Sequence, residues 1–437
     1  MIELKADMKL LPQKGIILVI VLWLIVILSA IAVGFGHSML VEYRIMANQS
    51  DKLITMELAK AGIEEGIAIL TNDSTEAGML TSPWHSGESE IWTVALGDGT
   101  FTLFNDRPEN EGEISYEIMD ENSKINLNSA TKAVLMKLPN VDEVIADSII
   151  DWRSATAKAS ANGAKDEYYT QLTPPYSCKN GPFDTVEELL LVKGITPAIL
   201  YGEDANQNGL LDANENDGDV SYPPDNADGK LDRGLYPYVT VYSSDINKSI
   251  SGQERIYLPS ASYSQLQRLT SYGLSTRDII AISDYLESHK DIRSLGDLLD
   301  VNGMTTEKLG LIADYVTFSR AQSVVGLVNI NTAPRSVLLA LPGMDETKAD
   351  QIIERRIGTE GPFKNVGDVG NVLDKTTFKQ VIDSITVRSS QFRIQSLGKL
   401  NDKKAFTRLL VVVDRYQLPI SPLYYRDISF LGQGIYP

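Results

Sequence analysis

The feature that most constrains this chain is a stretch near its N-terminus that carries no acidic or basic side chain. Between Gly15 and Val41 there is no Asp, Glu, Lys or Arg. A helix needs about 20 apolar residues to cross the hydrocarbon core of a bilayer, so this stretch is long enough. The sequence therefore predicts one retained membrane-spanning helix. The alternative is a cleaved signal peptide, whose apolar region is usually only about 7–15 residues long.

The residues on either side of the stretch predict its orientation and its length. Lys5, Lys9 and Lys14 precede it, so the positive-inside rule leaves the N-terminus in the cytoplasm and the bulk of the chain across the membrane. Apolar residues then recur at helical spacing beyond the membrane, at Leu53, Met56, Ile63, Ile67 and Leu70. We expect one helix from Gly15 to Leu70, with its first half in lipid and its second half packed on a soluble domain.

The start of this helix resembles that of type IV pilin-like proteins. Lys14-Gly15-Ile16 is similar to a prepilin peptidase site, which implies cleavage after Gly15 and methylation of Ile16. Most relatives carry Glu at the fifth residue after the cut, where it meets the charged N-terminus of a neighbouring subunit inside lipid. This chain has Ile20 there. Lack of that Glu resembles the minor pseudopilin K family of type II secretion systems, as does the segment Ala59–Leu70.

Alternating patterns predict short strands at both ends of the remaining chain. We expect strands at 90–96, 100–105, 114–119, 392–397 and 406–413, and a loop at 73–90. The fold class is then α+β, a pilin-like fold with a large, mostly α-helical insertion. The expected divisions are a leader (1–15), the transmembrane part of the helix (16–41), the pilin-like helix and sheet (42–122), the inserted domain (123–388) and the C-terminal strands (389–437).

The insertion contains an internal repeat. Ile125–Ala130 (Ile-Asn-Leu-Asn-Ser-Ala) and Val328–Ala333 (Val-Asn-Ile-Asn-Thr-Ala) each precede a helix, a Leu-Pro turn and a second helix, and Gly-Pro-Phe follows at 181–183 and 361–363. These pairs resemble helix-hairpin-helix repeats, and paired helices in this position again resemble the pseudopilin K family. In that family acidic residues would follow Asp151-Trp152, whereas Ser154, Ala155 and Thr156 stand here, which argues against a cation site at this place.

Charge argues against nucleic acid as a partner. The formal net charge is -18 and the isoelectric point about 4.7, whereas nucleic-acid binders usually present a basic surface. Both hairpins also run into acidic residues, at Asp142-Glu143 and Asp345-Glu346, which would repel phosphate. We interpret the hairpins as packing or partner-docking elements, with DNA contact as the alternative.

Residues 204–215 match the calcium-loop pattern D-x-[DN]-x-[DN]-G-x5-E at every specified position. Gly209 permits the sharp turn. The predicted ligands are Asp204, Asn206, Asn208, the main-chain carbonyl of Leu210, Asp212 and Glu215. Hard oxygen ligands favour Ca²⁺ over a soft metal. The alternative is a solvated loop without metal.

A second, poorer candidate loop follows the first. Asn226, Asp228 and Asp232 keep the spacing of ligand positions 3, 5 and 9, with Gly229 at the turn. Pro224 and Leu235 occupy the two end positions, although Asp225 could replace the first after a shift. The sequence therefore predicts one or two structural calcium ions.

No catalytic residue is predicted, because we find no glycine-rich phosphate loop, no G-x-S-x-G and no zinc spacing. The resemblance implies a tip subunit of the type II secretion pseudopilus in the bacterial inner membrane, assembling with minor pseudopilins I and J and other pseudopilus subunits after processing by prepilin peptidase. The first alternative is a minor pilin of a type IV pilus with a role in adhesion or DNA uptake. The second is a membrane-anchored enzyme, which would need a residue cluster that the sequence does not show.

Overall fold

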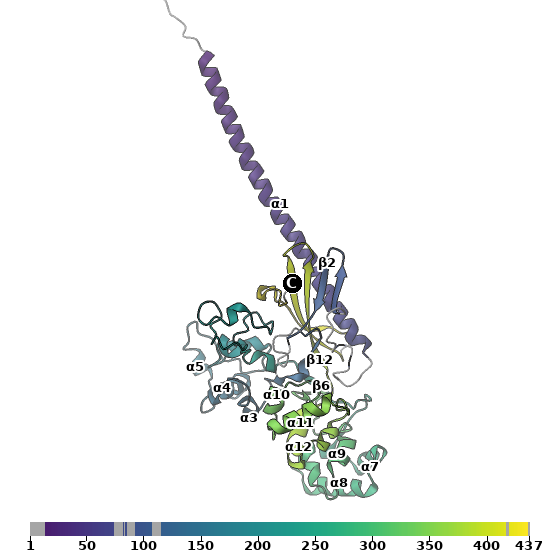
Figure 1. Ribbon diagram of the computed structural model, residues 1–437. Coiled ribbons are helices and arrows are strands. Elements are labelled where there is room, and N and C mark those ends of the chain that lie inside the picture. The colour runs from purple at the N-terminus through teal and green to yellow at the C-terminus, as the bar shows by residue number, and fades with distance from the viewer. Residues whose placement is uncertain are drawn as a thin grey trace, which may run out of the picture.

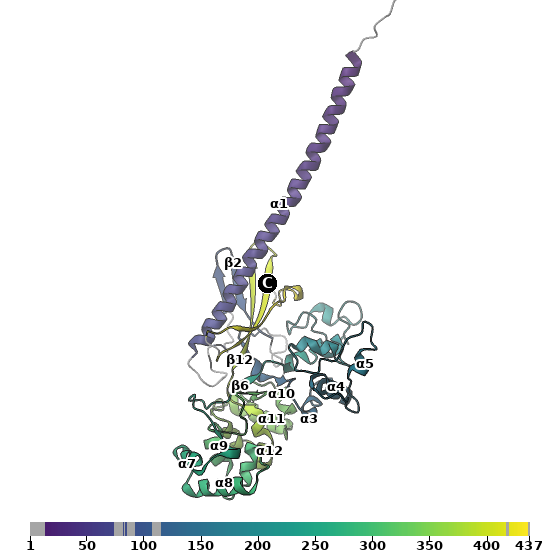
Figure 2. The same ribbon diagram turned by 180° about the vertical axis from the view of Figure 1, so that it is seen from behind.

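The computed structural model describes residues 14–73, 82, 84, 92–106, 115–416 and 419–435. Its longest element is α1 (Lys14–Asn72), a continuous helix of 59 residues. Over its N-terminal half α1 stands clear of the other elements, and its C-terminal half lies against the sheet (Figures 1 and 2). The prediction of one helix that runs through both the apolar stretch and the amphipathic stripe is therefore confirmed.

The helix packs on a six-stranded antiparallel sheet built from both ends of the chain. The strand order is β1-β2-β12-β13-β14, and β3 also pairs with β12. The bounds are β1 Thr93–Leu96, β2 Gly99–Leu103, β3 Met119–Asp120, β12 Gln391–Leu400, β13 Phe406–Asp414 and β14 Pro422–Asp427. Because β2 and β12 are neighbours in the sheet, the chain between β3 and β12 is an insertion that leaves the sheet and returns to it.

Small residues let α1 approach the sheet closely. A methyl group added at Gly398 would lie 2.2 Å from the carbonyl oxygen of Thr55, and one added at Gly66 would lie 2.8 Å from Ile394. The apolar residues buried between helix and sheet include Ala59, Ile63, Leu70, Phe392, Ile394 and Val411. Burial of each large side chain contributes about 1.5–3 kcal/mol, so this packed half fixes α1 to the soluble mass.

The N-terminal strands differ in part from the sequence prediction. The strand expected at 114–119 is present only in short pieces: Ser115 bridges Asn105, Glu117 makes a single bridge, and β3 begins at Met119. The side-chain amide of Asn105 donates to the carbonyl of Glu117 at 2.7 Å, so a side chain makes part of the pairing here. Ile114 and most of the loop expected at 73–90 lie outside the described residues. Strand β14 was not expected.

Buried carboxylates hold the insertion at its neck. The Asp120 carboxylate accepts hydrogen bonds from Asn329 (3.0 Å), Thr332 (2.6 Å) and Ser389 (2.6 Å). The neighbouring Glu121 accepts from Arg393 at 2.5 Å and from the hydroxyl of Thr240. These contacts join the sheet to segments that are far away in the sequence, so both connections between sheet and insertion are fixed.

Most of the insertion is three units of the same design. Each opens with a short strand, continues through two helices, a six-residue 3-10 helix and a third helix, and closes with a second strand that pairs parallel to the first. The first unit comprises β4 Ile125–Asn126, α3 Lys132–Leu135, α4 Glu143–Arg153, η2 Val186–Leu191, α6 Pro197–Tyr201 and β5 Val239–Thr240. The second comprises β7 Ile256–Tyr257, α7 Tyr263–Gln267, α8 Thr276–Ser288, η7 Leu295–Asp300, α9 Thr306–Ala313 and β8 Val316–Thr317. The third comprises β10 Val328–Asn329, α10 Arg335–Ala340, α11 Glu346–Ile357, η8 Val366–Asn371, α12 Lys375–Val381 and β11 Ile385–Thr386.

The first and third units share the same polar contacts. In the first, the side-chain amide of Asn128 donates to the carbonyl of Phe183 (3.0 Å) and accepts from its amide (2.7 Å). In the third, Asn331 makes the same pair of bonds with Phe363, at 2.9 and 2.8 Å. The Asn-x-Asn and Gly-Pro-Phe motifs of the sequence are thus hydrogen-bonding partners.

Other short elements lie within or between the units. The first unit also contains α5 Asp166–Tyr169 and η4 Tyr236–Tyr238. The strands β6 Ser244–Ile246 and β9 Ser323–Val325 flank the second unit in the sequence and pair antiparallel. In Figures 1 and 2 the three units lie at the end of the sheet away from the start of α1. The bulk of the protein is therefore at one end of the helix.

Candidate functional sites on the exposed helix and the acidic loops

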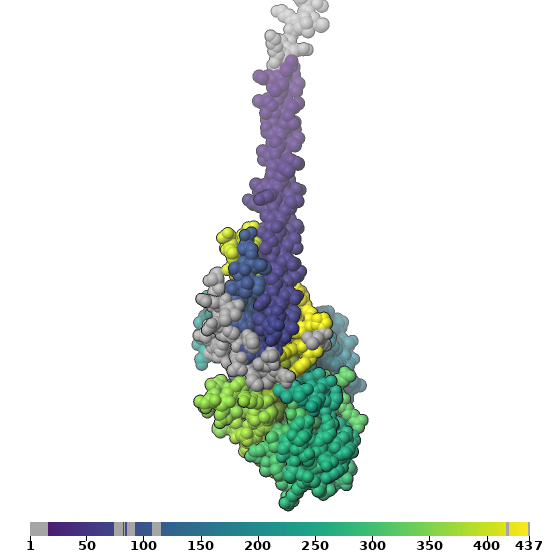
Figure 3. All heavy atoms as spheres, turned by 90° about the vertical axis from the view of Figure 1, so that its right-hand side faces the viewer, coloured from purple at the N-terminus to yellow at the C-terminus, as the bar shows by residue number. Residues whose placement is uncertain are grey.

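The N-terminal half of α1 is an unpartnered apolar rod. From Ile16 to Tyr43 every side chain is exposed, and the first fully buried residue of the helix is Thr55. Figure 3 shows this half free of other atoms on the face in view, while the second half is packed by the N-terminal and C-terminal strands. Among the described residues, α1 is the one helix long and apolar enough to cross a membrane. At a rise of about 1.5 Å per residue it exceeds the thickness of about 30 Å of a hydrocarbon core.

The predicted processing site lies at the start of this rod. Gly15 and Ile16 are in the first turn of α1, and Ile16 is exposed. Residues 1–13 of the predicted leader lie outside the described residues. Ile20 is also exposed, one turn further along.

The six predicted ligands of the first calcium loop belong to one tight loop between α6 and η3 (Ala213–Glu215). Asp204 accepts from the amides of Asn208 (2.9 Å) and Gly209 (3.1 Å), and Gly209 has a positive φ of 70°. Glu215 reaches back to the amides of Ala205 and Asp212. The backbone thus brings both ends of the loop together, as the sequence pattern predicts.

Two acidic side chains of this loop are buried. Asp204 and Glu215 are buried, and burial raises the pKa of Asp204 to about 6 and that of Glu215 to about 7, with the negative charge of Asp212 adding to both shifts. The side-chain amides of Asn206 and Asn208 donate to Asp212 at 2.6 and 3.1 Å. These neutral amide donors offset the charge of Asp212 less than a bound cation would.

Among the described residues, no three His, Cys, Asp or Glu side chains converge closely enough to hold a metal by themselves. Ligation in this loop would therefore also need the amide oxygens of Asn206 and Asn208 and the carbonyl of Leu210. All of these donors are hard oxygens, which fits Ca²⁺.

Two arginines fix the loop to the pilin-like sheet. Arg408 on β13 donates to the carbonyls of Asn206 (3.1 Å) and Gln207 (2.8 Å). Arg233 pairs with Asp106, and its guanidinium lies 3.9 Å from Asp204. The loop therefore ties the insertion to the sheet, a connection that sequence spacing could not show.

The second candidate loop is organised around a residue that sequence reasoning missed. The buried carboxylate of Glu203 accepts from the amides of Asn226 (3.1 Å) and Asp232 (3.2 Å), which joins both ends of that loop. Asp225 accepts from the amides of Asp217, Gly218 and Ala227, and Asp228 accepts from the amide of Lys230. Asn226 and Asp232 likewise accept from the amides of Asp228 and Gly234. All four candidate residues thus cap backbone amides, and Glu203 links this loop to the first.

At the place where the family would carry acidic residues, a lysine supplies the cation. The ammonium of Lys165 is buried and donates to the carbonyls of Asp151 (2.5 Å) and Ser154 (2.6 Å) and to the side-chain oxygen of Asn180 (2.7 Å). These oxygens are already satisfied by the protein's own positive charge.

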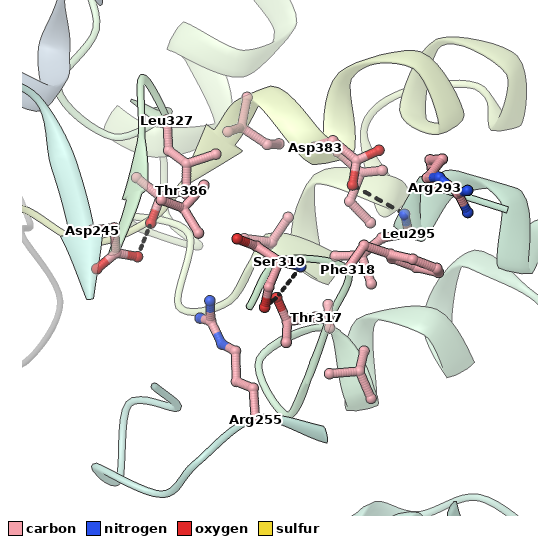
Figure 4. A pocket seen from close by; sticks show the side chains of 16 residues that line it. Asp245, Arg255, Arg293, Leu295, Thr317, Phe318, Ser319, Leu327, Asp383 and Thr386 are labelled. Atoms are coloured by element: carbon pink, nitrogen blue, oxygen red, sulfur yellow. Dashed lines mark hydrogen bonds between the residues drawn. The ribbon is translucent and has the colours of Figure 1, made fainter. Parts of the chain in front are cut away.

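A cavity of 310 Å³ lies between the second and third units (Figure 4). Its charged groups are bonded to the protein: Asp383 accepts from the amide of Leu295 at 3.0 Å, and Arg255 pairs with Asp314 at 2.9 Å. Thr386 donates to Asp245 at 3.4 Å. This arrangement offers neither a paired acid and base nor an activated nucleophile.

Two family models described as "Type II secretion system (T2SS), protein K" match residues 122–201 and 328–388, which lie in the first and third units. A curated relative, "Type II secretion system protein K" of Pseudomonas aeruginosa, is 24% identical over 198 residues, or 41% of this chain and 57% of that relative. The matched part therefore spans little more than half the length of the relative.

A solved structure is similar over most of the chain. It is described as the crystal structure of the GspK-GspI-GspJ complex from the enterotoxigenic Escherichia coli type 2 secretion system. The likeness covers 87% of this chain and 98% of the other, with a TM-score of 0.48 and 14% identity.

Proposed function

Because the chain belongs to the type II secretion system protein K family, we propose that it is a non-enzymatic minor pseudopilin at the tip of the pseudopilus. There it seeds assembly of the filament that exports folded proteins across the outer membrane. One observation carries this proposal: α1 is an exposed apolar rod over one half, and the other half is fixed to a bulky mass at the opposite end. A rod of this kind can leave the membrane by packing against the helices of other subunits.

Two features favour the tip over the shaft. The three units widen the molecule beyond the sheet, and such bulk would obstruct the close stacking of subunits along a shaft. Ile20 leaves the lipid-embedded helix without the acidic residue that would meet the N-terminus of a subunit ahead. Together they describe a subunit with neighbours behind it and none in front.

The same proposal includes the location of the protein in the membrane and the processing of its N-terminus. The helix spans the inner membrane once, with the lysines before it in the cytoplasm and the sheet and insertion in the periplasm. Prepilin peptidase cuts between Gly15 and Ile16, and the new N-terminus is methylated.

We also propose that residues 123–388 form the inserted domain and that its helix-hairpin-helix-like turns serve packing rather than nucleic-acid binding. The helix N-termini are capped by the protein's own carboxylates, Asp142 on the amide of Ile145 (2.8 Å) and Asp345 on the amide of Lys348 (3.0 Å). Lys137 of the first unit donates to three carbonyls at the hairpin of the third, those of Leu339, Leu341 and Met344, at 3.1–3.4 Å. The amides of Ile145 and Lys348 and the ammonium of Lys137 already bond to the protein's own oxygens, which disfavours phosphate binding through them.

For the first acidic loop we propose a structural Ca²⁺ ion held by Asp204, Asn206, Asn208, Leu210, Asp212 and Glu215. For Asp225, Asn226, Asp228 and Asp232 we propose a weaker second ion beside Glu203. Such an ion offsets the charge of the buried carboxylates and so stabilises the conformation of the loop. It thereby also stabilises the contact that Arg408 makes between the loop and the sheet.

The proposed partners are minor pseudopilins I and J, bound along the exposed part of α1 next to the sheet. The test is co-expression of the full chain with both proteins, followed by purification in detergent through a tag on this chain. Leu53 is 67% exposed on α1, and in the proposed complex it lies against the partner helices. We expect recovery of both partners with the unmodified chain and at least about tenfold less with Leu53→Glu, since a charge would enter an apolar contact.

The matched control is Lys52→Ala, at a neighbouring exposed position that is already polar. It should leave recovery unchanged. Failure of the unmodified chain to retain either partner would overturn the proposal.

A further inference from the structure

The second and third units pair through the same surface on each. Helix α9 of the second unit packs on η8 of the third, and α12 of the third packs on η7 of the second. The contacts are close: a methyl group added at Gly310 in α9 would lie 2.7 Å from Gly367 in η8. At the reciprocal contact, one added at Gly296 in η7 would lie 2.2 Å from the carbonyl of Lys379 in α12. The pairing face of a unit is therefore its 3-10 helix and third helix.

The first unit has the same face but presents different residues on it. The second residue of the 3-10 helix is Gly296 in the second unit and Gly367 in the third, but Glu187 in the first. The fifth residue of the third helix is Gly310 in the second unit and Lys379 in the third, but Tyr201 in the first. Glu187, which stands where both other units have glycine, and the ring of Tyr201 would keep another helical unit from approaching as closely as the second and third units approach each other.

A cavity of 530 Å³ lies on this face of the first unit, and both Glu187 and Tyr201 line it. Its other walls come from β14 and the segment after it, from Tyr236, and from the acidic loops. Five aromatic side chains line it, and the ring centroids of two of them, Tyr201 and Tyr236, lie 5.6 Å apart. The Arg426 guanidinium lies 5.4 Å from the Phe430 ring while it pairs with Glu187. Phe430 and Tyr222 at the rim are 70% and 73% exposed.

We propose that this cavity is a docking site for an extended, apolar peptide segment of a partner protein, flanked by basic residues. The equivalent faces of the other two units bind protein, so the same face of the first unit is suited to a protein segment. A single extended strand fits where Glu187 and Tyr201 exclude a helical unit. Rings of tyrosine with hydroxyl groups at their edges suit such a segment, because they pack against apolar side chains and bond to main-chain groups.

Charge supports basic flanks on that segment. The acidic segment 203–235 forms one wall through Ala205, Gln207 and Tyr222, and it carries nine carboxylates against two basic residues, Lys230 and Arg233. Two bound calcium ions would still leave this segment net negative. A basic flank is therefore attracted to the rim, and the attraction should weaken with salt.

The test measures binding of three fluorescein-labelled octapeptides to the full chain in detergent micelles by fluorescence anisotropy. Each octapeptide has Lys at both ends, and the three cores are built of Leu and Pro, of Tyr and Pro, and of Leu and Tyr. Each is compared with a control peptide of the same core that has Glu in place of Lys. We expect at least one lysine-flanked peptide to bind, its glutamate partner to bind at least about tenfold more weakly, and Phe430→Ala to weaken binding by at least about tenfold.

The matched control is Ile357→Ala, which removes a side chain of similar exposure (69%) from the third unit. It should leave binding unchanged. Because Phe430 and Ile357 lie on the surface, both variants are expected to fold. The proposal is overturned if none of the three peptides binds, or if the Phe430 and Ile357 variants bind alike.

Discussion

The first and third units share the same internal hydrogen bonds but differ in what lies against their 3-10 helix and third helix. Both carry the Asn-to-Phe hydrogen-bond pair. Both also have an arginine in the last turn of the second helix that donates to carbonyls in the turn after the opening strand. The third unit is completed by protein, since its pairing face is covered by the second unit. The first unit is completed by an acidic loop with buried carboxylates and by an open cavity. The common contacts build the unit, and the differences mark the places of the proposed calcium site and the proposed peptide site.

The largest expected difference between the units is their response to calcium removal. If the loop holds Ca²⁺, a chelator should destabilise the first unit and leave the third unchanged. At a free calcium concentration about 100 times the dissociation constant, the loss is about 2.7 kcal/mol. Hydrogen exchange of the full chain in micelles measures this unit by unit.

Asp204→Ala/Glu215→Ala should abolish the response of the first unit to calcium. The control, Glu287→Ala/Glu354→Ala, removes two exposed carboxylates from the other units and should retain it. Equal exchange with and without chelator in the unmodified chain would contradict the calcium proposal.

A smaller difference in unfolding free energy is expected when Arg356 of the third unit and Arg153 of the first are replaced. Arg356 is buried and donates to the carbonyls of Ile330 (3.1 Å) and Ala333 (2.7 Å), whereas the equivalent Arg153 is partly exposed. Replacing either with Met leaves carbonyls without their charged donor, at a cost of about 1–3 kcal/mol. We expect Arg356→Met to lower the free energy of unfolding more than Arg153→Met, because water can reach the carbonyls near Arg153. Urea denaturation measures both, and a larger loss at Arg153 would show that the first unit depends more on its framework than we infer.

These comparisons also show what the sequence could reveal. The period of its apolar residues predicted α1, and the positions of Gly209 and its neighbouring Asp and Asn residues predicted a tight turn within 204–215. The middle unit was missed, since Tyr257 and Pro259 stand where the other units have their two asparagines. Glu203 was missed because its role depends on the fold bringing the amides of Asn226 and Asp232 to it. The aromatic cavity joins distant segments and leaves no local pattern.

The smallest effect concerns pH at the neck, where Asp120 bonds to the third unit and Glu121 to the first. Burial raises the pKa of Asp120 to about 6 from 3.8, against the opposing effect of its hydrogen bonds. The ionised carboxylate therefore costs the folded state stability at neutral pH, and this cost falls as the pH drops below 6.

From these values Asp120 should add about 1 kcal/mol of stability between pH 7 and pH 5. The Asp120→Asn variant, which does not titrate at this position, should lack that gain. The measurement compares urea denaturation of both proteins at the two pH values. An identical pH dependence would mean that Asp120 does not hold a raised pKa.

The central claim is that this protein leads the filament, and its position in assembled pseudopili tests that claim most directly. Gold-labelled antibody against the helical insertion can be located on purified pseudopili by electron microscopy. The account predicts label at one end of each filament and none along the shaft. Label distributed along the shaft would contradict it.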